Sequence, residues 1–197
     1  MDDRTGAILV STARRAVETY LYRGEMYRPE AVGPLNERRG VFVSIYNHPD
    51  RALRGCVGFV QVDLPLAEAT ARAAVAAAFE DPRFPPLRRE EVSKVVFEVS
   101  LLTAPEPINV SRREKLPEHV VVGEDGLIIE TPYGSGLLLP QVPVEYGWNA
   151  EEYLSHLCMK AGLDPNYWVY GKMRLSRFKA EVFMELEPSG RVERKKI

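Results

Sequence analysis

The run Leu53-Arg54-Gly55-Cys56-Val57-Gly58-Phe59 has the composition of a β-strand with a chemically unusual face. Side chains alternate between the two faces of a strand, so Arg54, Cys56 and Gly58 share one face and the apolar residues share the other with Gly55. The apolar set is the natural core face. The alternation therefore predicts a guanidinium and a thiol side by side on the face that points away from the core.

The segments around this run extend it into a hairpin. Residues 41–46 are strand-like, and Asn47-His48-Pro49-Asp50 is dense in turn-forming residues. We therefore expect the run to begin a returning strand from Leu53 to Val62. Upstream, helical spacing of apolar residues predicts an amphipathic helix from Thr5 to Tyr22, with Gly24 as its stop.

Downstream, the pattern predicts another helix and another strand. Pro65 suits the first position of a helix that runs to about Phe79 and is rich in alanine, which lets a sheet approach closely. A short helical turn over 90–93 precedes a strand from Val95 to Thr103. Apolar and polar residues alternate in that strand, which is typical of one buried face.

The second half of the chain has shorter expected elements. Residues 120–122 and 127–129 flank Gly123-Glu124-Asp125-Gly126 and predict a hairpin. We expect a further hairpin turn at 134–136, a helix from Ala150 to Ala161, and strands over 173–178 and 180–186. The charged run 191–196 is expected to be a solvated tail.

Length and composition favour an ordinary globular fold. The chain has 197 residues, 45% of them hydrophobic, and a net charge of -2, so it shows no overall bias toward nucleic acid or anionic membranes. This charge disfavours nucleic-acid binding unless a local basic cleft supplies the cations. Strands and helices alternate without a regular βαβ rhythm. We therefore expect an α+β fold of mainly antiparallel sheets flanked by helices.

The cysteine and histidine content bounds the compartment and the cofactors. Cys56 and Cys158 lie far apart, the chain opens with an acidic segment, and no apolar run is long enough to cross a membrane. We expect a cytoplasmic protein without membrane partners, with both cysteines as free thiols. The scattered histidines and the absence of paired cysteines argue against a metal site, and no cofactor is expected.

Cys56 is the candidate reactive group. A nearby cation such as Arg54 lowers a thiol pKa, and the thiolate is the reactive form. Gly55 and Gly58 can mark a place where a ligand approaches the backbone, which points to a site for a small anion or a thiol-reactive molecule. The alternative is that Cys56 is a small buried hydrophobe and that the glycines accommodate packing.

The candidate partners of Cys56 lie in neighbouring segments. His48, in the turn before the strand, is the candidate base, although a histidine in such a turn is more often solvated. Asp81 and Arg83 follow the alanine-rich helix and are candidates for a polar pair at a cleft edge. Their alternative interpretation is a helix stop with a local surface ion pair, which contributes little stability.

Several motifs in register resemble the AMMECR domain family. The resemblance covers about residues 5 to 185, and its motifs are Leu53-Arg54-Gly55-Cys56-Val57-Gly58, the segment Ala78-Phe79-Glu80-Asp81-Pro82-Arg83-Phe84-Pro85-Pro86-Leu87, the strand Val99-Ser100-Leu101-Leu102, the stretch Leu138-Leu139-Pro140 before Gly147-Trp148, and Lys160-Ala161-Gly162. Phe59 and the segment 141–144 depart from the family pattern. The departure at 141–144 puts a shared role for the Pro140 loop in doubt.

The resemblance implies a fold, a site and partners. It implies a single AMMECR-type domain over 1–197, built of two unequal, closely packed lobes with a cleft near the cysteine run. We expect a small-molecule or modified-nucleotide site in this cleft, with Cys56 as nucleophile or polar anchor and Arg54 as thiolate stabiliser or anion contact. Asp81 or Arg83 would be partners at the edge of the cleft. In prokaryotes the AMMECR domain family is associated with a Memo-like protein and a radical S-adenosylmethionine protein. This association implies an alternative function, in which the chain is a non-enzymatic scaffold for such a partner.

Overall fold

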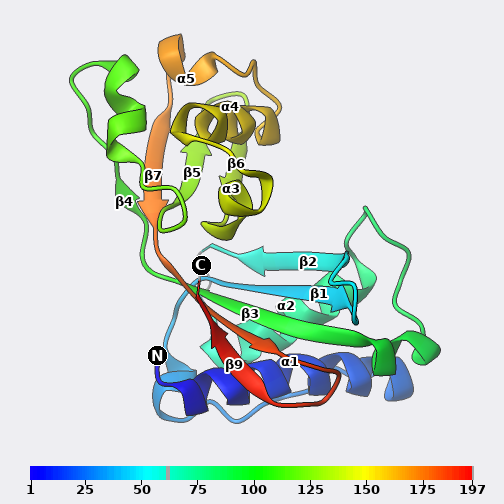
Figure 1. Ribbon diagram of the computed structural model, residues 1–197. Coiled ribbons are helices and arrows are strands. Elements are labelled where there is room, and N and C mark those ends of the chain that lie inside the picture. Colours follow the sequence, from blue (N-terminus) through cyan, green and yellow to red (C-terminus); the bar gives the residue numbers. More distant parts are fainter. Residues whose placement is uncertain (61–62, 197) are drawn as a thin grey trace. The chain divides into compact units, whose positions relative to one another are not determined.

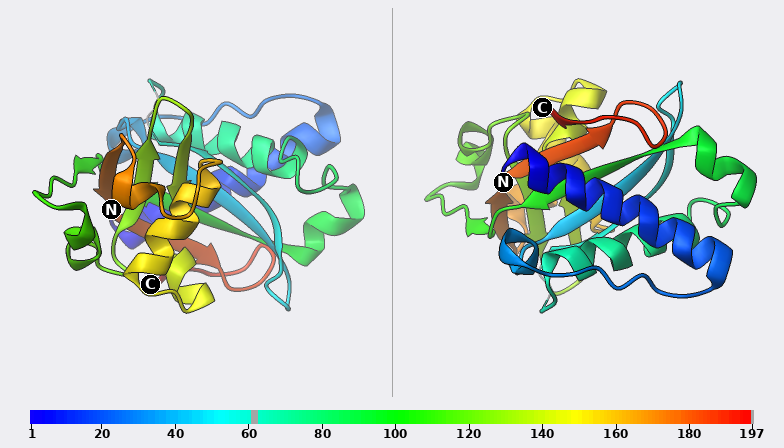
Figure 2. Two further views of the ribbon diagram at one scale, coloured as in Figure 1. Left: turned by 90° about the horizontal axis from the view of Figure 1, so that it is seen from above. Right: turned by 90° about the horizontal axis from the view of Figure 1, so that it is seen from below.

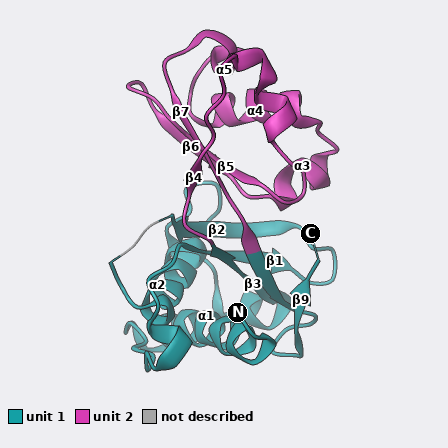
Figure 3. Ribbon diagram, turned by 90° about the vertical axis from the view of Figure 1, so that its left-hand side faces the viewer, with its two compact units in different colours: residues 1–102, 181–196 teal, residues 103–180, 197 magenta. Residues whose placement is uncertain are grey.

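The computed structural model describes residues 1–60 and 63–196, and the chain forms two compact units (Figure 3). Unit 1 consists of residues 1–102 and 181–196, and unit 2 of residues 103–180. Unit 1 is therefore discontinuous in sequence, and unit 2 is inserted into it. Each unit has a hydrophobic core of its own. The cleft expected between two lobes stays a prediction.

Unit 1 is a helix-covered antiparallel sheet with strand order β2-β1-β3-β8-β9. Its main elements are α1 (Asp3–Arg23), β1 (Val41–Asn47), β2 (Leu53–Phe59), α2 (Leu66–Phe79), β3 (Val95–Leu102), β8 (Ala180–Glu185) and β9 (Val192–Lys195) (Figure 1). Two 3-10 helices, η1 (Gly33–Asn36) and η2 (Arg89–Lys94), lie between them. Strand β2 ends one edge of this sheet, so one side of the cysteine strand has no neighbouring strand.

Unit 2 is a smaller sheet with strand order β4-β7-β5-β6. Its elements are β4 (Glu106–Pro107), η3 (Arg113–His119), β5 (Gly126–Glu130), β6 (Ser135–Leu138), α3 (Gln141–Tyr146), α4 (Ala150–Lys160), α5 (Tyr167–Tyr170) and β7 (Arg174–Phe178). Strand β5 pairs antiparallel with both β6 and β7. Together with the antiparallel pairs of unit 1, this confirms the expected α+β class.

Helices α1 and α2 lie on the same side of the unit 1 sheet (Figure 2). The side chains between them and the sheet include Leu9, Val43 and Val99, which are fully buried. Asp2 caps α1 by accepting a hydrogen bond from the Thr5 N–H at 2.8 Å. Gly24 ends the helix, as predicted, and its φ of 71° is a left-handed conformation that glycine adopts readily.

The predicted hairpin around residues 123–126 is wrong, because residues 120–122 form no strand. They follow η3, and the Asp125 side chain closes a turn by accepting a hydrogen bond from the Val121 N–H at 2.8 Å. The partner of β5 is β6, with Leu127 opposite Leu138. The expected turn at 134–136 is shifted too, since Ser135 and Gly136 already belong to β6.

The charged run near the C-terminus is also not a solvated tail. Residues 192–195 form β9, which pairs antiparallel with β8. Val192 packs against the unit 1 core, and the Arg194 guanidinium lies over the Phe183 ring, 4.7 Å from its centroid. The strand β2 ends at Phe59 rather than Val62, and residues 61–62 of that prediction lie outside the described residues.

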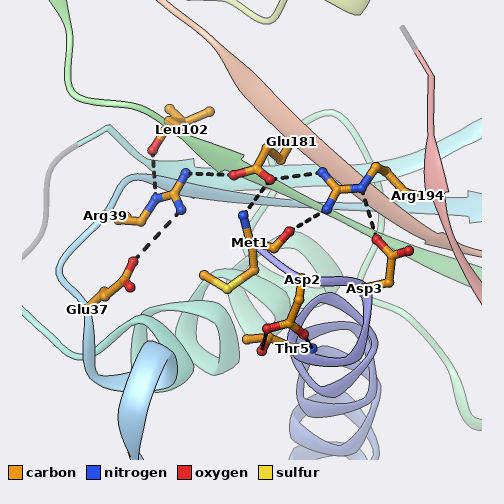
Figure 4. A network of polar contacts seen from close by, with 9 residues as sticks. All are labelled: Met1, Asp2, Asp3, Thr5, Glu37, Arg39, Leu102, Glu181 and Arg194. Carbon is orange, nitrogen blue, oxygen red and sulfur yellow. Dashed lines mark hydrogen bonds and ion pairs between the residues drawn. The ribbon is translucent and has the colours of Figure 1, made fainter.

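A network of ion pairs fastens β8 to the start of unit 1 (Figure 4). The Glu181 carboxylate accepts hydrogen bonds from the Met1 amino group at 2.7 Å, from Arg194 at 2.9 Å and from Arg39 at 3.2 Å.

Within the described residues, no helix has the length and apolar character that a membrane crossing requires.

Candidate functional site

Strand register places Cys56 in a row of polar side chains on the sheet face opposite the helices. Cys56 lies opposite Ser44 on β1, and Ser44 lies opposite Glu98 on β3. The neighbouring position, Gly55, faces α2, because a Cβ there would lie 2.1 Å from the Ala77 carbonyl oxygen. The predicted alternation about Cys56 therefore holds, and the thiol points away from the helix-covered core.

Cys56 is a partly exposed residue, and its thiol accepts a hydrogen bond from a side chain. The Ser44 hydroxyl donates to the Cys56 sulfur, with 3.3 Å between Oγ and Sγ. The second cysteine, Cys158, is fully buried in the core of unit 2. Both are free thiols, and Cys56 is the partly exposed residue of the two.

Asp81 and Arg83 hold the backbone of Cys56 at the open edge of β2. The Asp81 carboxylate accepts hydrogen bonds from the Cys56 N–H at 2.9 Å and from the Arg83 guanidinium at 2.7 Å and 3.0 Å. The Arg83 guanidinium in turn donates to the Cys56 carbonyl at 3.3 Å. The two side chains thus occupy the place of a neighbouring strand, and they protect this edge from unwanted pairing.

The exposure of this pair is unequal. The Asp81 side chain is buried, while 48% of the Arg83 side chain is exposed. The hydrogen bonds from Arg83 keep the pKa of Asp81 well below its ordinary value. The arrangement therefore presents a fixed cation to solvent beside a partly exposed thiol.

The surroundings of Cys56 favour the neutral thiol. Burial raises its pKa, while the Ser44 hydrogen bond and the charge of Arg83 lower it. The negative charges of Glu98 and Asp81 act in the same direction as burial, and the net pKa is above the ordinary value. Without a ligand, the Cys56 side chain is thus a neutral, polarisable thiol that forms only weak hydrogen bonds.

Arg54 is held away from the thiol by an acidic partner. Its guanidinium makes a bidentate ion pair with Glu91 of η2, at 2.9 Å and 3.3 Å. The register of β1 and β2 shifts between Ile45 and Tyr46, beside Arg54. Among the described groups, the cation that lowers the pKa of Cys56 is Arg83 rather than Arg54.

Gly55 and Gly58 are both explained by close packing. A Cβ on Gly55 would meet the α2 backbone, and a Cβ on Gly58 would lie 2.4 Å from both the Phe42 ring and the Val41 carbonyl oxygen. The side chain of Phe42 therefore fills the space that the absent side chain of Gly58 leaves. The packing alternative accounts for the two glycines, and a binding role for them stays a prediction.

His48 lies at the far end of the hairpin from Cys56. It follows Ser44, the partner of Cys56, by four positions, which is about 13 Å of extended chain. Its backbone N–H donates to the Lys94 carbonyl at 2.8 Å, and within the described residues its buried Nδ1 has no hydrogen-bond partner. The structure does not bring His48 and Cys56 together.

The sequence interpretation missed Ser44 and Glu98 as members of this row. Glu98 is fully buried and contacts the Tyr46 hydroxyl and the Lys195 ammonium, each at 3.4 Å. The neighbouring Ser100 is buried as well, so β3 is covered on both faces. The alternation of apolar and polar residues in β3 indicated that this strand has a polar face. Whether that face is buried and aligned with Cys56 depends on how the strands pair, which the alternation does not specify.

Comparison with known proteins gives a consistent set of relatives. The AMMECR1 family model matches residues 10–183. Protein MJ0810 of Methanocaldococcus jannaschii is 47% identical over 192 residues, which are 98% of this chain and 96% of that protein. A protein of Thermofilum pendens is 49% identical over 197 residues, with 95% of this chain and 92% of that protein covered.

A solved structure is similar over the whole chain. The crystal structure of protein PH0010 from Pyrococcus horikoshii is 46% identical in sequence and has a TM-score of 0.96. The similarity covers 100% of this chain and 99% of that one.

Among residues 1–60 and 63–196, no three His, Cys, Asp or Glu side chains come together as metal ligands would.

Proposed function

The chain belongs to the AMMECR1 family, and from this premise we propose that Cys56 and Arg83 form the centre of a binding site for a small molecule or a modified nucleotide. The observation that carries the proposal is the partly exposed residue Cys56, whose thiol is bonded by Ser44 and whose backbone is held by the Asp81–Arg83 pair. Fixed polar groups of this kind orient a ligand without losing conformational freedom when it binds.

The residues have distinct roles in this proposal. Arg83 supplies the positive charge for an anionic group of the ligand, because its guanidinium is half exposed although Asp81 holds it in place. Asp81 positions Arg83 and the Cys56 backbone. The neutral Cys56 thiol contacts the ligand as a polar anchor, and a nucleophilic role requires the ligand or a partner to supply a base.

Native mass spectrometry after gentle purification tests this proposal. We expect a bound small molecule in the wild-type protein and its loss in Arg83→Ala, since that change removes the exposed cation. Arg174→Ala is the matched control, because Arg174 is an exposed arginine of unit 2 with 69% of its side chain exposed. The proposal would be contradicted if Arg83→Ala and Cys56→Ala each carried the bound molecule in the same proportion as the wild-type protein.

A surface of unit 2 favours a second function, a scaffold for a protein partner such as a Memo-like or radical S-adenosylmethionine protein. The rings of Tyr133 and Tyr167 pack edge to face at 6.5 Å, and those of Tyr167 and Tyr170 at 5.5 Å. Tyr133 and Tyr170 remain largely exposed. Exposed aromatic clusters of this kind are common at protein interfaces.

The two functions are separated by two variants in one binding experiment. The scaffold function predicts that Tyr133→Ser/Tyr170→Ser abolishes co-purification of a partner from the native host, while Cys56→Ser leaves it intact. The small-molecule function predicts that the tyrosine variant retains the bound molecule. Retention of the partner by the tyrosine variant would contradict the scaffold function.

A further inference from the structure

A groove runs along the solvent-facing side of α1, beside the segment that follows this helix. Two hollows of about 880 Å³ and 410 Å³ share Arg15 and Tyr27 in their walls. Six of the α1 residues in these walls recur at helical spacing and form one stripe: Arg4, Ile8, Ser11, Arg15, Thr19 and Tyr22. Residues 25–28 form the opposite wall of the larger hollow.

The groove is positively charged although the chain as a whole is not. Its walls carry Arg4, Arg15, Arg23 and Arg28, none of which has an ion-pair partner among the residues that the structure describes. The acidic groups in the walls are Glu18 and Glu25, and Glu18 lies 3.6 Å from Arg14. This local excess of cations contrasts with the net charge of -2.

The arginines lie among aromatic rings. The Arg15 guanidinium is stacked over the Tyr27 ring, 4.8 Å from its centroid, and Arg89 is stacked over Tyr22 at 5.3 Å. Tyr22 is 53% exposed. Both guanidinium planes and aromatic rings are surfaces on which unpaired bases stack.

The cations are spread along a line and do not converge on one point. From Arg4 to Arg23 the helix rises about 28 Å, with Arg15 between them. A mononucleotide would need its cations gathered around one phosphate group. A ligand with regularly spaced phosphates matches a linear arrangement, and interleaved bases match the rings.

We propose that this groove binds single-stranded nucleic acid, with the four arginines on the phosphates and the Tyr22 and Tyr27 neighbourhoods on the bases. The inference does not rest on the Cys56 site, which lies on the other face of the unit 1 sheet. It identifies a local basic surface that the overall charge conceals.

Fluorescence anisotropy with a labelled 12-nucleotide oligouridine tests the inference. We expect binding at 50 mM salt that weakens steeply by 200 mM, and at least a tenfold weaker Kd in Arg15→Glu/Arg28→Glu. For the association constant, the slope of log K against log salt is negative, and the loss of two phosphate contacts makes it shallower by about 1.4. Arg112→Glu/Lys115→Glu is the charge-matched control, because both residues are exposed, lie in unit 2 and have no ion pair among the described residues.

Competitors separate the ligand classes in the same assay. We expect unlabelled oligouridine to displace the probe far better than equal concentrations of uridine monophosphate or a polyglutamate peptide. Equal Kd values for wild type and Arg15→Glu/Arg28→Glu, or an equal loss in Arg112→Glu/Lys115→Glu, would overturn the inference. So would displacement by polyglutamate as effective as by oligouridine, or the absence of binding at 50 mM salt. Circular dichroism of both variants verifies that they are folded.

Discussion

The thiol of Cys56 is governed by groups from three different segments of the chain. Ser44 donates a hydrogen bond to it, Arg83 places a positive charge nearby, and Glu98 places a negative charge two strands away. Burial outweighs the first two effects and raises the pKa of Cys56. A ligand that brings a cation, or one that draws Glu98 into a stronger ion pair, would shift this balance toward the thiolate.

Asp81 is the residue on which the geometry of the site depends most. We expect Asp81→Asn to lower the free energy of unfolding by about 2 kcal/mol, because the buried amide cannot replace the charged acceptor of the Arg83 and Cys56 hydrogen bonds. Urea denaturation measures this change. The matched control is Glu68→Gln, which breaks the exposed pair with Arg72 and should change stability by less than about 1 kcal/mol. Equal effects of the two changes would contradict a structural role for Asp81.

Sequence reasoning predicted the Asp81–Arg83 pair but not its target. The two residues are close in sequence, so their ion pair could be inferred locally. The hydrogen bonds from this pair to Cys56 span more than twenty positions, and the pairing of Arg54 with Glu91 spans 37. Such contacts depend on where the segment 80–94 returns along the sheet edge, which no local pattern specifies.

At the scale of elements, the approach of α2 to β2 decides the position of Cys56. The alanines of α2 and the absence of a side chain at Gly55 allow the helix backbone to lie directly against the strand. The composition of α2 predicted a close approach of this kind. The close contact of Gly55 with α2 therefore fixes the orientation of β2 next to Cys56.

Gly55→Ala tests this contact. We expect a loss of about 1–3 kcal/mol of stability, because the new Cβ would lie 2.1 Å from the Ala77 carbonyl oxygen and the backbone of α2 must move. Urea denaturation measures the change, and the rate of Cys56 alkylation should change with it. The control Ser11→Ala adds no atom to the core and lies on the exposed side of α1. A stability equal to that of wild type would contradict the close contact.

The hairpins show where strand prediction succeeded and failed. The β1–β2 hairpin was predicted because its strands and turn are contiguous, and the turn formers lie between two apolar runs. In unit 2 the apolar run 120–122 resembled a strand, but the Asp125 side chain bonds the Val121 N–H and closes a turn instead. Side-chain hydrogen bonds of this type compete with strand pairing and leave little trace in the hydrophobic pattern.

At the scale of the whole molecule, the two ends of unit 1 are joined by charged groups. Glu181 follows the inserted unit 2 and binds Met1, Arg39 and Arg194 (Figure 4). A second pair, Arg14 with Glu185, is buried and has an N···O distance of 2.6 Å. The discontinuity of unit 1 could not be predicted from the sequence, because these contacts join residues more than 140 positions apart.

Glu181 makes the stability of the fold depend on pH. Burial raises its pKa, but the hydrogen bonds from the Met1 amino group, Arg194 and Arg39 outweigh burial and lower the pKa from 4.5 to about 2. A carboxyl whose pKa is lowered by folding stabilises fully above its unfolded pKa. That contribution is lost as the pH falls from about 4.5 toward 2.

We therefore expect Glu181→Gln to destabilise the protein by about 2 kcal/mol at pH 7 and by progressively less toward pH 2.5. Urea denaturation of wild type and variant across this pH range measures the difference. Glu187→Gln serves as the control, since Glu187 forms no ion pair among the described residues. A difference between Glu181→Gln and wild type that stays constant with pH would contradict the role of the charge.

The central claim is that Cys56 is a partly exposed residue with a neutral thiol, and that Arg83 is the cation beside this thiol. The rate of iodoacetamide alkylation at Cys56 between pH 6 and 10.5, followed by peptide mass spectrometry with buried Cys158 as the internal control, tests it most directly. We predict a midpoint above the ordinary value of 9.0, a higher midpoint still in Arg83→Ala, and no shift in Arg54→Gln. A midpoint below 9.0, or one that moves with Arg54 and not with Arg83, would contradict the account.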